Sequence, residues 1–210
     1  MPRPNVETER RAQILRAACT VIAEKGFRAV RVADVAHEAG LSSGIVHYYF
    51  PTKRDLVRAA FEENFAYSLE RRRAILASGD DTITKLRALV DAFVPRDPET
   101  IRSWRLWAEL WVECIHDRDL RELNDRAYGE WRRLVAEIVR DGQIAGDIGE
   151  ADAVEVANML TGVLDGLALQ VIAGSPGMRL TRMRTTCQSL IDQVIPVGPG
   201  RPEARTAEPG

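Results

Sequence analysis

The stretch VADVAHEAGLSSGIVHYYF, residues 32–50, decides the fold, because it holds two short helical patterns separated by one tight turn. Ala36 and Ala39 lie on the inward face of the first pattern, and the small Ala36 allows another helix to cross closely. Gly40 permits the positive φ that a tight turn between helices requires. Ser42 is a natural N-cap, because its hydroxyl accepts a backbone N–H of the next helix. Together these features predict a helix-turn-helix.

The second helix of this motif, residues 43–50, has two different sides. Val46 and Phe50 share one face and belong to the core. The other faces carry small residues first and rings with hydrogen-bonding tips later, namely Ser43, Gly44, Ile45, His47, Tyr48 and Tyr49. In a recognition helix the first residues meet base edges, while hydroxyl groups and amides hold phosphates. We therefore expect this side to face DNA; the alternative is an aromatic cluster that packs against the next helix.

Lys53 stands at the start of the following helix, where Thr52 is the expected N-cap and Asp55 the partner of a capping-box-like pair. A cation beside the positive end of a helix is unfavourable unless an anion joins it. A DNA phosphate is such an anion, so we expect Lys53 to contact the DNA backbone. The alternative is a lysine that is simply solvated.

Almost every long segment of the chain has helical periodicity, which predicts an all-α protein. We expect a helix-turn-helix DNA-binding domain over residues 1–52 and a helical effector-binding and dimerisation domain over residues 53–195. The Pro- and Gly-rich residues 196–210 are expected to form a disordered tail. The expected helices cover approximately residues 7–25, 32–39, 43–50, 53–77, 82–94, 98–116, 119–141, 151–173 and 180–195.

The composition is that of a soluble globular protein, with 45% hydrophobic and 29% charged residues among 210. The net charge of −2 is unevenly distributed: nine basic and five acidic residues up to residue 54 give +4, which leaves −6 for the remainder. A basic head on an acidic body is typical of a protein that touches nucleic acid at one end. No membrane span or secretory segment is evident, and Cys19, Cys114 and Cys187 have no metal-binding spacing. We expect a cytoplasmic protein without cofactor or metal.

Residues 10–56 resemble the DNA-binding domain of the TetR family of one-component bacterial regulators. Within that family, LSSGIVHYYF (41–50) and LTGVLDGLALQVI (160–172) are most similar to the BetI-like branch, whose founding type responds to choline. The resemblance implies an all-helical homodimer that binds a palindromic operator and releases it when a small molecule enters the C-terminal domain. It does not identify choline as the effector of this chain.

The resemblance also implies which residues contact DNA, namely Ser42, Ser43, Gly44, Ile45, His47, Tyr48, Tyr49 and Lys53. One position departs from the family pattern. Arg31 stands where Thr or Ser usually caps the first helix of the motif, and an arginine has no acceptor with which to cap. Its guanidinium can still reach a phosphate, so Arg31 is also expected to contact DNA.

The helix expected near residues 98–116 is apolar around most of its circumference and carries Trp104, Trp107 and Trp111 on one stripe. Such a helix is largely buried, as a central helix beside a cavity would be. The three indoles are candidates for the effector pocket, because aromatic faces attract cationic ligands. The alternative for each is plain core packing.

The last two expected helices each carry a broad apolar face and are candidates for an isologous four-helix interface between two subunits. Gly162 and Gly166 would allow close approach there. The candidate interface residues are Val163, Leu164, Leu167, Val171, Met183, Leu190, Ile191 and Val194. The alternative is that these faces form the core of a single chain.

The sequence therefore predicts a DNA-binding transcriptional regulator, a repressor released by a small-molecule effector. One alternative is an architectural DNA-binding protein without an effector, although bending DNA would not need the large acidic C-terminal region. A helical enzyme is the other alternative, but no HExxH, GxSxG or P-loop pattern appears in the chain.

Overall fold

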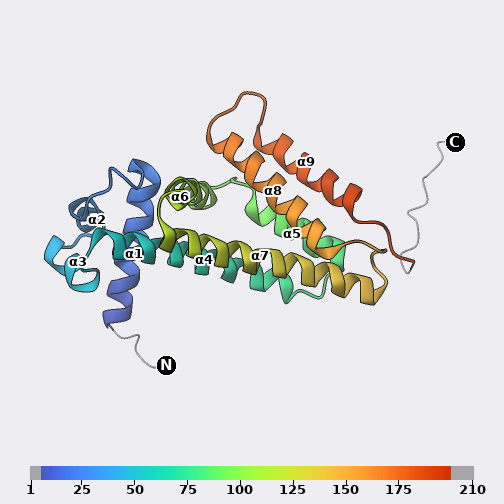
Figure 1. The fold of residues 1–210 in the computed structure, drawn as a ribbon, viewed down its shortest axis with the longest axis horizontal. Helices are drawn as coiled ribbons and strands as arrows, with labels where there is room; N and C mark the ends of the chain where they lie inside the picture. Colours follow the sequence, from blue (N-terminus) through green and yellow to red (C-terminus); the bar gives the residue numbers. More distant parts are fainter. Residues whose placement is uncertain (1–5, 200–210) are drawn as a thin grey trace. The chain divides into compact units, whose positions relative to one another are not determined.

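A computed structural model describes residues 6–199 and shows nine helices among them (Figure 1). No β-strand is present in these residues, so the expectation of an all-helical fold is confirmed. The helices are α1 (Val6–Lys25), α2 (Val32–Glu38), α3 (Ser43–Tyr49), α4 (Lys53–Leu76), α5 (Thr82–Phe93), α6 (Pro98–Cys114), α7 (Arg118–Ala145), α8 (Ala153–Ile172) and α9 (Leu180–Val194).

The chain forms two compact units. The first unit contains the described residues up to Arg71 together with Pro95–Ala127, and the second contains Arg72–Val94 and the described residues from Tyr128 onwards. Long helices α4 and α7 each contribute to both units. These compact units do not test the boundary expected after residue 52 between a DNA-binding and an effector-binding domain, which stays a prediction.

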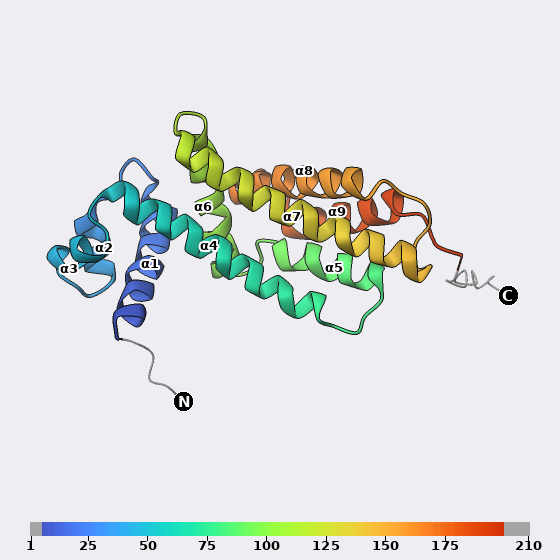
Figure 2. The same ribbon diagram turned by 60° about the horizontal axis from the view of Figure 1, so that its bottom comes forward.

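The first unit has one continuous core that joins the helix-turn-helix to α6. Leu106 and Leu110 of α6 are fully buried and belong to the same cluster as Ile14 and Ile22 of α1 and Val46 of α3. Within this unit α1 lies between α3 and α6 (Figure 2). The head thus completes its hydrophobic core with a helix that lies far from it in the sequence.

Helix α6 has a well-defined start. Asp97 is its N-cap and accepts the backbone N–H groups of Glu99 at 3.1 Å and Thr100 at 2.8 Å. The bond from the Thr100 N–H is the largest cause of the lowered pKa of the Asp97 carboxyl. Pro98 occupies the first turn, where a missing N–H costs nothing. This cap fixes where the tryptophan-bearing helix begins.

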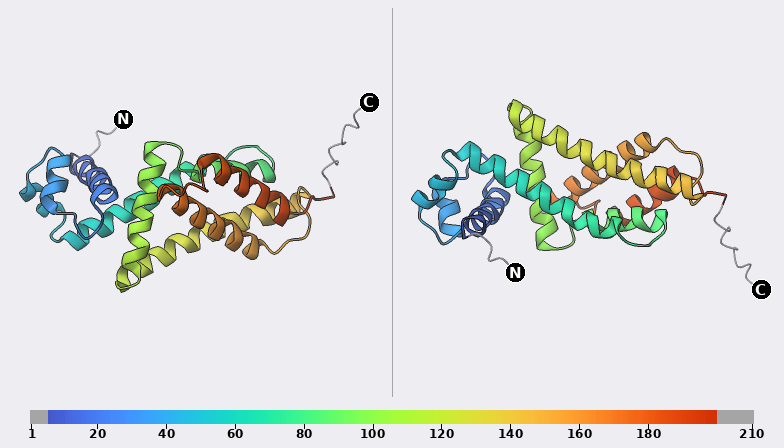
Figure 3. Two further views of the ribbon diagram at one scale, coloured as in Figure 1. Left: turned by 90° about the horizontal axis from the view of Figure 1, so that it is seen from above. Right: turned by 90° about the horizontal axis from the view of Figure 1, so that it is seen from below.

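In the second unit, α8 and α9 lie side by side and α5 packs on α9 (Figures 1 and 3). Met183, Cys187 and Ile191 of α9 are fully buried in this arrangement. Two ion pairs link α5 to α9 at the surface: Arg184 with Asp91, and Arg87 with Asp192. Exposed pairs of this kind contribute about 0–1 kcal/mol each, so the buried apolar residues hold these helices together.

Residues 196–198 are not disordered, which corrects the expectation for the start of the tail. Ile148 and Val197 form an antiparallel bridge, and the Gly149 N–H donates to the Pro196 carbonyl oxygen at 2.8 Å. The Gly198 N–H returns a bond of 3.2 Å to Asp147, and only a glycine fits there, because an added Cβ would lie 2.1 Å from the Gly146 carbonyl oxygen. Residues 200–210, the rest of the expected tail, lie outside the described part of the chain.

Helix α8 is apolar and long enough to cross a membrane by length and composition alone. It carries Glu155 and Asp165, and its buried stripe packs within the second unit. Core helices of soluble proteins pass the same test, so this helix is weak evidence for a membrane span.

Candidate DNA-binding and effector sites

The turn between α2 and α3 has the geometry that its residues predict. Gly40 adopts a φ of 65°, and the Leu41 N–H donates to the Ala36 carbonyl oxygen at 2.8 Å. The Ser42 side chain accepts the Ile45 N–H at 3.3 Å, which confirms it as the N-cap of α3. These local bonds hold α3 at a fixed angle to α2, as a helix-turn-helix requires.

The outer side of α3 is exposed. Tyr48 has 77% of its surface accessible and Ile45 has 39%, while Ser42, Gly44 and His47 are also exposed. Ser43 is half-buried. Because the large Tyr48 ring is exposed to solvent, this side of α3 is accessible to a binding partner. The residues expected to read DNA are therefore accessible, and their contacts with bases stay a prediction.

Tyr49 differs from Tyr48. It is half-buried, packs against the core of the first unit, and meets the Tyr48 ring edge-on with centroids 5.2 Å apart. The position of the Tyr49 ring therefore agrees in part with the alternative, an aromatic cluster that packs inward. Tyr49 supports Tyr48 on the exposed side of the helix.

Arg31 is the N-cap residue of α2, and its backbone supplies only half of a capping box. The Arg31 N–H donates to the Asp34 carboxylate at 3.1 Å, and no cap bond returns to the Arg31 side chain because a guanidinium has no acceptor. The Lys25 ammonium lies 2.8 Å from the same carboxylate and is the main cause of the lowered pKa of Asp34. The exposed guanidinium of Arg31 is thus left out of the cap.

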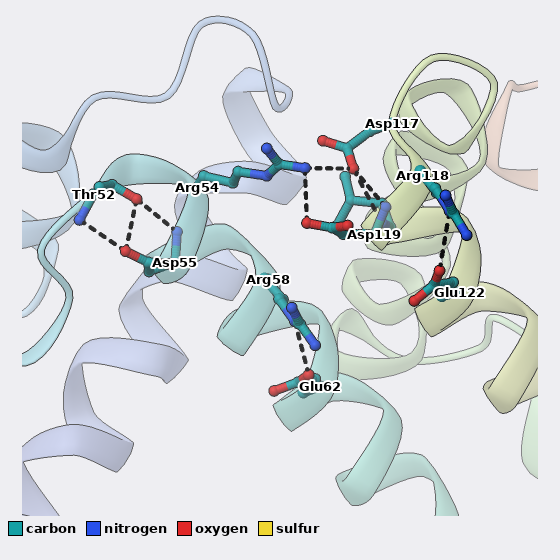
Figure 4. Close-up of polar contacts among 10 residues, drawn as sticks. Thr52, Arg54, Asp55, Arg58, Glu62, Asp117, Arg118, Asp119 and Glu122 are labelled. Atoms are coloured by element: carbon teal, nitrogen blue, oxygen red, sulfur yellow. Dashed lines mark hydrogen bonds and ion pairs between the residues drawn. The ribbon is translucent and has the colours of Figure 1, made fainter.

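Lys53 is not simply solvated. Its ammonium donates to the Arg28 carbonyl oxygen at 3.1 Å and lies 5.3 Å from the centroid of the Phe27 ring. The expected capping pair is present: the Asp55 N–H donates to the Thr52 hydroxyl at 3.1 Å, and the Thr52 N–H donates to the Asp55 carboxylate at 3.2 Å (Figure 4). The amide end of α4 therefore has a positioned cation beside it.

Two carboxylates of α6 hold the turn that ends α1. The Glu109 carboxylate accepts the Phe27 N–H at 2.7 Å, and the Glu113 carboxylate accepts from the Arg28 guanidinium at 3.2 Å. Gly26 brings the backbone close, since a Cβ at this position would lie 3.2 Å from the Glu109 carboxylate. The sequence alone does not indicate this clamp, because Phe27 and Glu109 are 82 positions apart in the chain.

A second link joins α4 to the turn between α6 and α7. The Arg54 guanidinium donates to Asp117 at 2.9 Å and to Asp119 at 3.0 Å (Figure 4). Asp117 also accepts the Asp119 N–H at 2.9 Å, so it caps the start of α7. The first unit thus ties α6 to the DNA-binding head at several points.

The three tryptophans of α6 lie along one side of the helix, and Trp107 packs against the core cluster that contains Leu106 and Leu110. Trp104 is 5% exposed, and its ring meets that of Trp111 with centroids 6.3 Å apart. Trp107 is half-buried and meets Phe65 of α4, also at 6.3 Å. The Trp111 indole N–H is buried and has no hydrogen-bond acceptor. Trp104 and Trp111 thus contact each other and Trp107 contacts Phe65, and the contact of these rings with an effector stays a prediction.

A second aromatic cluster lies wholly in the second unit. The rings of Phe93 of α5 and Trp131 of α7 have centroids 4.4 Å apart. The guanidinium of Arg72 lies over both rings, 4.2 Å from the first centroid and 4.5 Å from the second. The sequence alone does not indicate this cluster, because its members are far apart in the chain.

Asp165 of α8 is half-buried and contacts Tyr128 of α7. The Tyr128 hydroxyl, one helical turn before Trp131, donates to its carboxylate. Burial raises the pKa of the Asp165 carboxyl to about 6, although the Tyr128 hydrogen bond and the charge of Arg132 act in the opposite direction. The second unit therefore contains a half-buried acid that is hydrogen-bonded to a tyrosine.

Three of the candidate interface residues are in fact core residues of the single chain. Leu164 is 2% exposed, and Met183 and Ile191 are fully buried, so the structure assigns them to intrachain packing and not to a subunit surface. Helical periodicity identifies an apolar face but not what covers it. The other candidates, Val163, Leu167, Val171, Leu190 and Val194, are half-buried.

The accessible side of α8 carries different residues. Met159 is 40% and Leu169 is 44% exposed. Gly162 and Gly166 lie between them, and an added Cβ on either glycine would meet nothing within 4 Å. This side of α8 is open to close approach by another helix.

Within residues 6–199 no group of three or more His, Cys, Asp and Glu side chains could hold a metal ion. Burial raises the pKa of the Cys19 thiol to about 12, and its Sγ–H donates to the Ala60 carbonyl oxygen. This cysteine is thus a packed thiol and is poorly suited to nucleophilic chemistry.

An exposed helix presented by a tight helix-turn-helix, on a helical body that shares its core, is typical of a DNA-binding regulator. Residues 14–60 match the family model for bacterial regulatory proteins of the tetR family, and residues 83–196 match that for the C-terminal region of BetI-type transcriptional repressors. The chain belongs to the TetR family, with a C-terminal region of the BetI type. It is a DNA-binding transcriptional regulator.

Full-length relatives agree with this assignment. The regulator BetI of Paraburkholderia xenovorans is 30% identical over 93% of this chain and 98% of its own length. BetI of Paraburkholderia phytofirmans is 32% identical over 84% of this chain and 89% of its own. Both relatives are named as regulators of transcription, and neither name indicates an architectural DNA-binding protein or an enzyme.

Solved structures show the same fold. A transcriptional regulator of Saccharomonospora viridis, crystallised in complex with choline, is 32% identical with a TM-score of 0.84, over 90% of this chain and 98% of that one. A TetR-family regulator from Rhodococcus sp. is 27% identical with a TM-score of 0.79, over 90% of this chain and 99% of its own.

Proposed function

We propose that this chain is a cytoplasmic repressor that acts as a homodimer on a palindromic operator and is released by a small cationic effector. The observation that carries the DNA-binding part is the exposed side of α3, with Tyr48 the most accessible of its rings. Its N-terminal residues, Ser43, Gly44 and Ile45, meet base edges in the major groove. The Tyr48 hydroxyl, Lys53 and Arg31 hold phosphates.

The dimer forms through the accessible side of α8, with Met159, Gly162, Gly166 and Leu169 at its centre. A surface of this kind is self-complementary when two copies meet about a twofold axis. Half-buried Leu167, Val171 and Leu190 complete the interface. Two heads in one dimer then read two half-sites that lie about 34 Å apart, or a multiple of that distance, as one palindrome.

The effector carries a quaternary or similar ammonium group. The reasons are the choline bound to the Saccharomonospora relative and the aromatic side chains in both units of this chain. Two aromatic clusters are candidate sites: Trp104, Trp107 and Trp111 of α6, and Phe93 of α5 with Trp131 of α7. An effector against the α6 rings displaces α6, and the other side of α6 holds Phe27 and Arg28 through Glu109 and Glu113.

The proposal is tested in two steps. An operator is selected from a random double-stranded library with the purified protein, and binding is followed by fluorescence anisotropy at fixed salt. Choline, tetramethylammonium and the neutral analogue 3,3-dimethylbutan-1-ol are then added. We expect a palindromic consensus and release by the two cations but not by the neutral analogue. A consensus without symmetry, or equal release by the alcohol, would contradict the proposal.

A further inference from the structure

Arg72 is a buried cation held by aromatic rings. Its residue exposure is 4%, and its guanidinium lies 4.2 Å from the Phe93 centroid and 4.5 Å from the Trp131 centroid. Trp131 is itself only 7% exposed. Arginine side chains are rarely this buried, so the rings replace much of the hydration that the charge has lost.

The two rings form the kind of site that attracts a weakly hydrated cation. Their planes are tilted by 56°, and both lie within 6 Å of the same charge, the range in which a ring attracts a cation. Guanidinium is weakly hydrated compared with a primary ammonium, which suits it to a desolvated position. A trimethylammonium group has the same two properties, a single diffuse charge and weak hydration.

We propose that the Phe93–Trp131 pair is the binding site for the ammonium group of the effector, and that Arg72 occupies it as a resident cation when no effector is bound. The inference rests on the proposed function, because it requires a cationic effector. Two cations cannot share one pair of rings in a desolvated site without strong repulsion. The incoming ammonium therefore replaces the guanidinium.

The position of Arg72 makes this exchange a switch. Arg72 lies on α4, which is continuous from Lys53 at the helix-turn-helix to Leu76. Its stacking fastens α4 to α5 and α7 in the second unit. Once the guanidinium leaves the rings, that attachment is lost and α4 is free to adopt the form that the effector favours. An effector that bound both forms equally would shift nothing.

Arg72 also weakens the apparent affinity for the effector. If the rings are free in only about one molecule in ten, the apparent dissociation constant is about tenfold higher than the intrinsic one. Arg72→Met removes the charge and keeps a long apolar side chain, so it should bind choline and tetramethylammonium about tenfold more tightly in calorimetric titrations. Arg73→Met, an equal charge change at the next, exposed position of α4, should bind like the wild type.

Phe93→Leu provides a second test when it is combined with Arg72→Met. Because loss of one ring weakens the hold on Arg72 as well as on choline, the double variant is compared with Arg72→Met alone, which has no resident cation. We expect choline affinity to fall about fivefold, the loss of about 1 kcal/mol of cation–π attraction. Unchanged or weaker choline binding by Arg72→Met, or equal binding by the single and double variants, would overturn the inference.

The outcomes separate this inference from the proposed function. If choline releases the wild type from its operator, but Arg72→Met binds choline no more tightly than the wild type does, the proposed function stands and the site is elsewhere. If neither choline nor tetramethylammonium binds the wild type, the cationic effector and the inference both fail. Operator binding by the effector-free protein then still establishes the DNA-binding function by itself.

Discussion

The Glu109 carboxylate accepts the backbone N–H of Phe27 at 2.7 Å, which joins the middle of α6 to the turn that ends α1. The two residues are 82 positions apart in the chain. The tryptophan side of the same helix faces away from this contact. In the proposed function a shift of α6 would reach the turn before the helix-turn-helix through this bond, so Glu109 would act as a point of coupling as well as a stabilising residue.

Glu109→Ala should lower the free energy of unfolding by about 1.5–3 kcal/mol, because a charge-assisted bond to a partly buried backbone N–H is lost. The matched control is Glu113→Ala, whose partner Arg28 has a side chain 76% exposed, and it should cost about 0–1 kcal/mol. Urea denaturation at one pH measures both. Equal costs for the two variants would mean that the Phe27 contact has no special weight.

Gly44→Ala should separate stability from DNA binding. A Cβ at position 44 would meet only the Ser42 hydroxyl oxygen, at 3.8 Å, so it fits the protein. Because alanine favours a helix over glycine by about 0.5–1 kcal/mol, the variant should be slightly more stable. The same methyl group would stand between the backbone of α3 and DNA, so operator affinity should fall. Wild-type affinity together with raised stability would show that α3 does not approach DNA at Gly44.

Lys53→Ala should weaken binding to all DNA sequences and reduce the salt dependence of binding by about one counterion. Tyr48→Phe should also weaken binding through the lost phosphate bond, without changing the salt slope or the stability, since the ring is exposed. Arg58→Ala is the control for charge: it lies on the same helix, and its side chain is 45% exposed and paired with Glu62. Affinity measured over a series of salt concentrations compares the three variants. An unchanged slope for folded Lys53→Ala would exclude a phosphate contact.

Local chemistry accounts for what the sequence predicted well. The Gly40 turn, the Ser42 cap and the Thr52–Asp55 pair depend on residues a few positions apart, and each forms as expected. The Glu109 clamp and the Arg72 stacking join residues that only the packing of helices brings together. The same limit explains why Leu164, Met183 and Ile191 were expected at a subunit interface although they lie in the core. An apolar stripe on a helix has the same periodicity whether another subunit or the same chain covers it.

The accessible side of α8 leads to a prediction about assembly. Leu169→Asp places a charge on a side chain that is 44% exposed, so the chain should stay folded while the dimer dissociates at micromolar concentration. Leu164→Asp, at a position 2% exposed, should instead unfold the chain. Sedimentation velocity and circular dichroism distinguish the two results. A dimeric Leu169→Asp protein would place the interface away from this side of α8.

Asp165 should make stability depend on pH. Burial raises the pKa of its carboxyl in the folded chain to about 6 from 3.8, so the folded state binds a proton more readily than the unfolded state. The contribution of this group to stability therefore rises as the pH falls through about 6 and is complete below 3.8. Above pH 6 the buried charge is a constant penalty of up to about 3 kcal/mol, since one pKa unit corresponds to about 1.4 kcal/mol.

Asp165→Asn should remove that penalty, because an uncharged amide oxygen can still accept the Tyr128 hydroxyl. We expect the variant to be more stable than the wild type at pH 7.5, with the difference shrinking towards zero or reversing by pH 4. Thermal unfolding from pH 4 to 8 measures the difference, and Asp141→Asn, an exposed change on α7, controls for the loss of one negative charge. A difference between Asp165→Asn and wild type that is constant across this range would mean that Asp165 does not titrate within it. The buried acid would then contribute to packing and not to the response to pH.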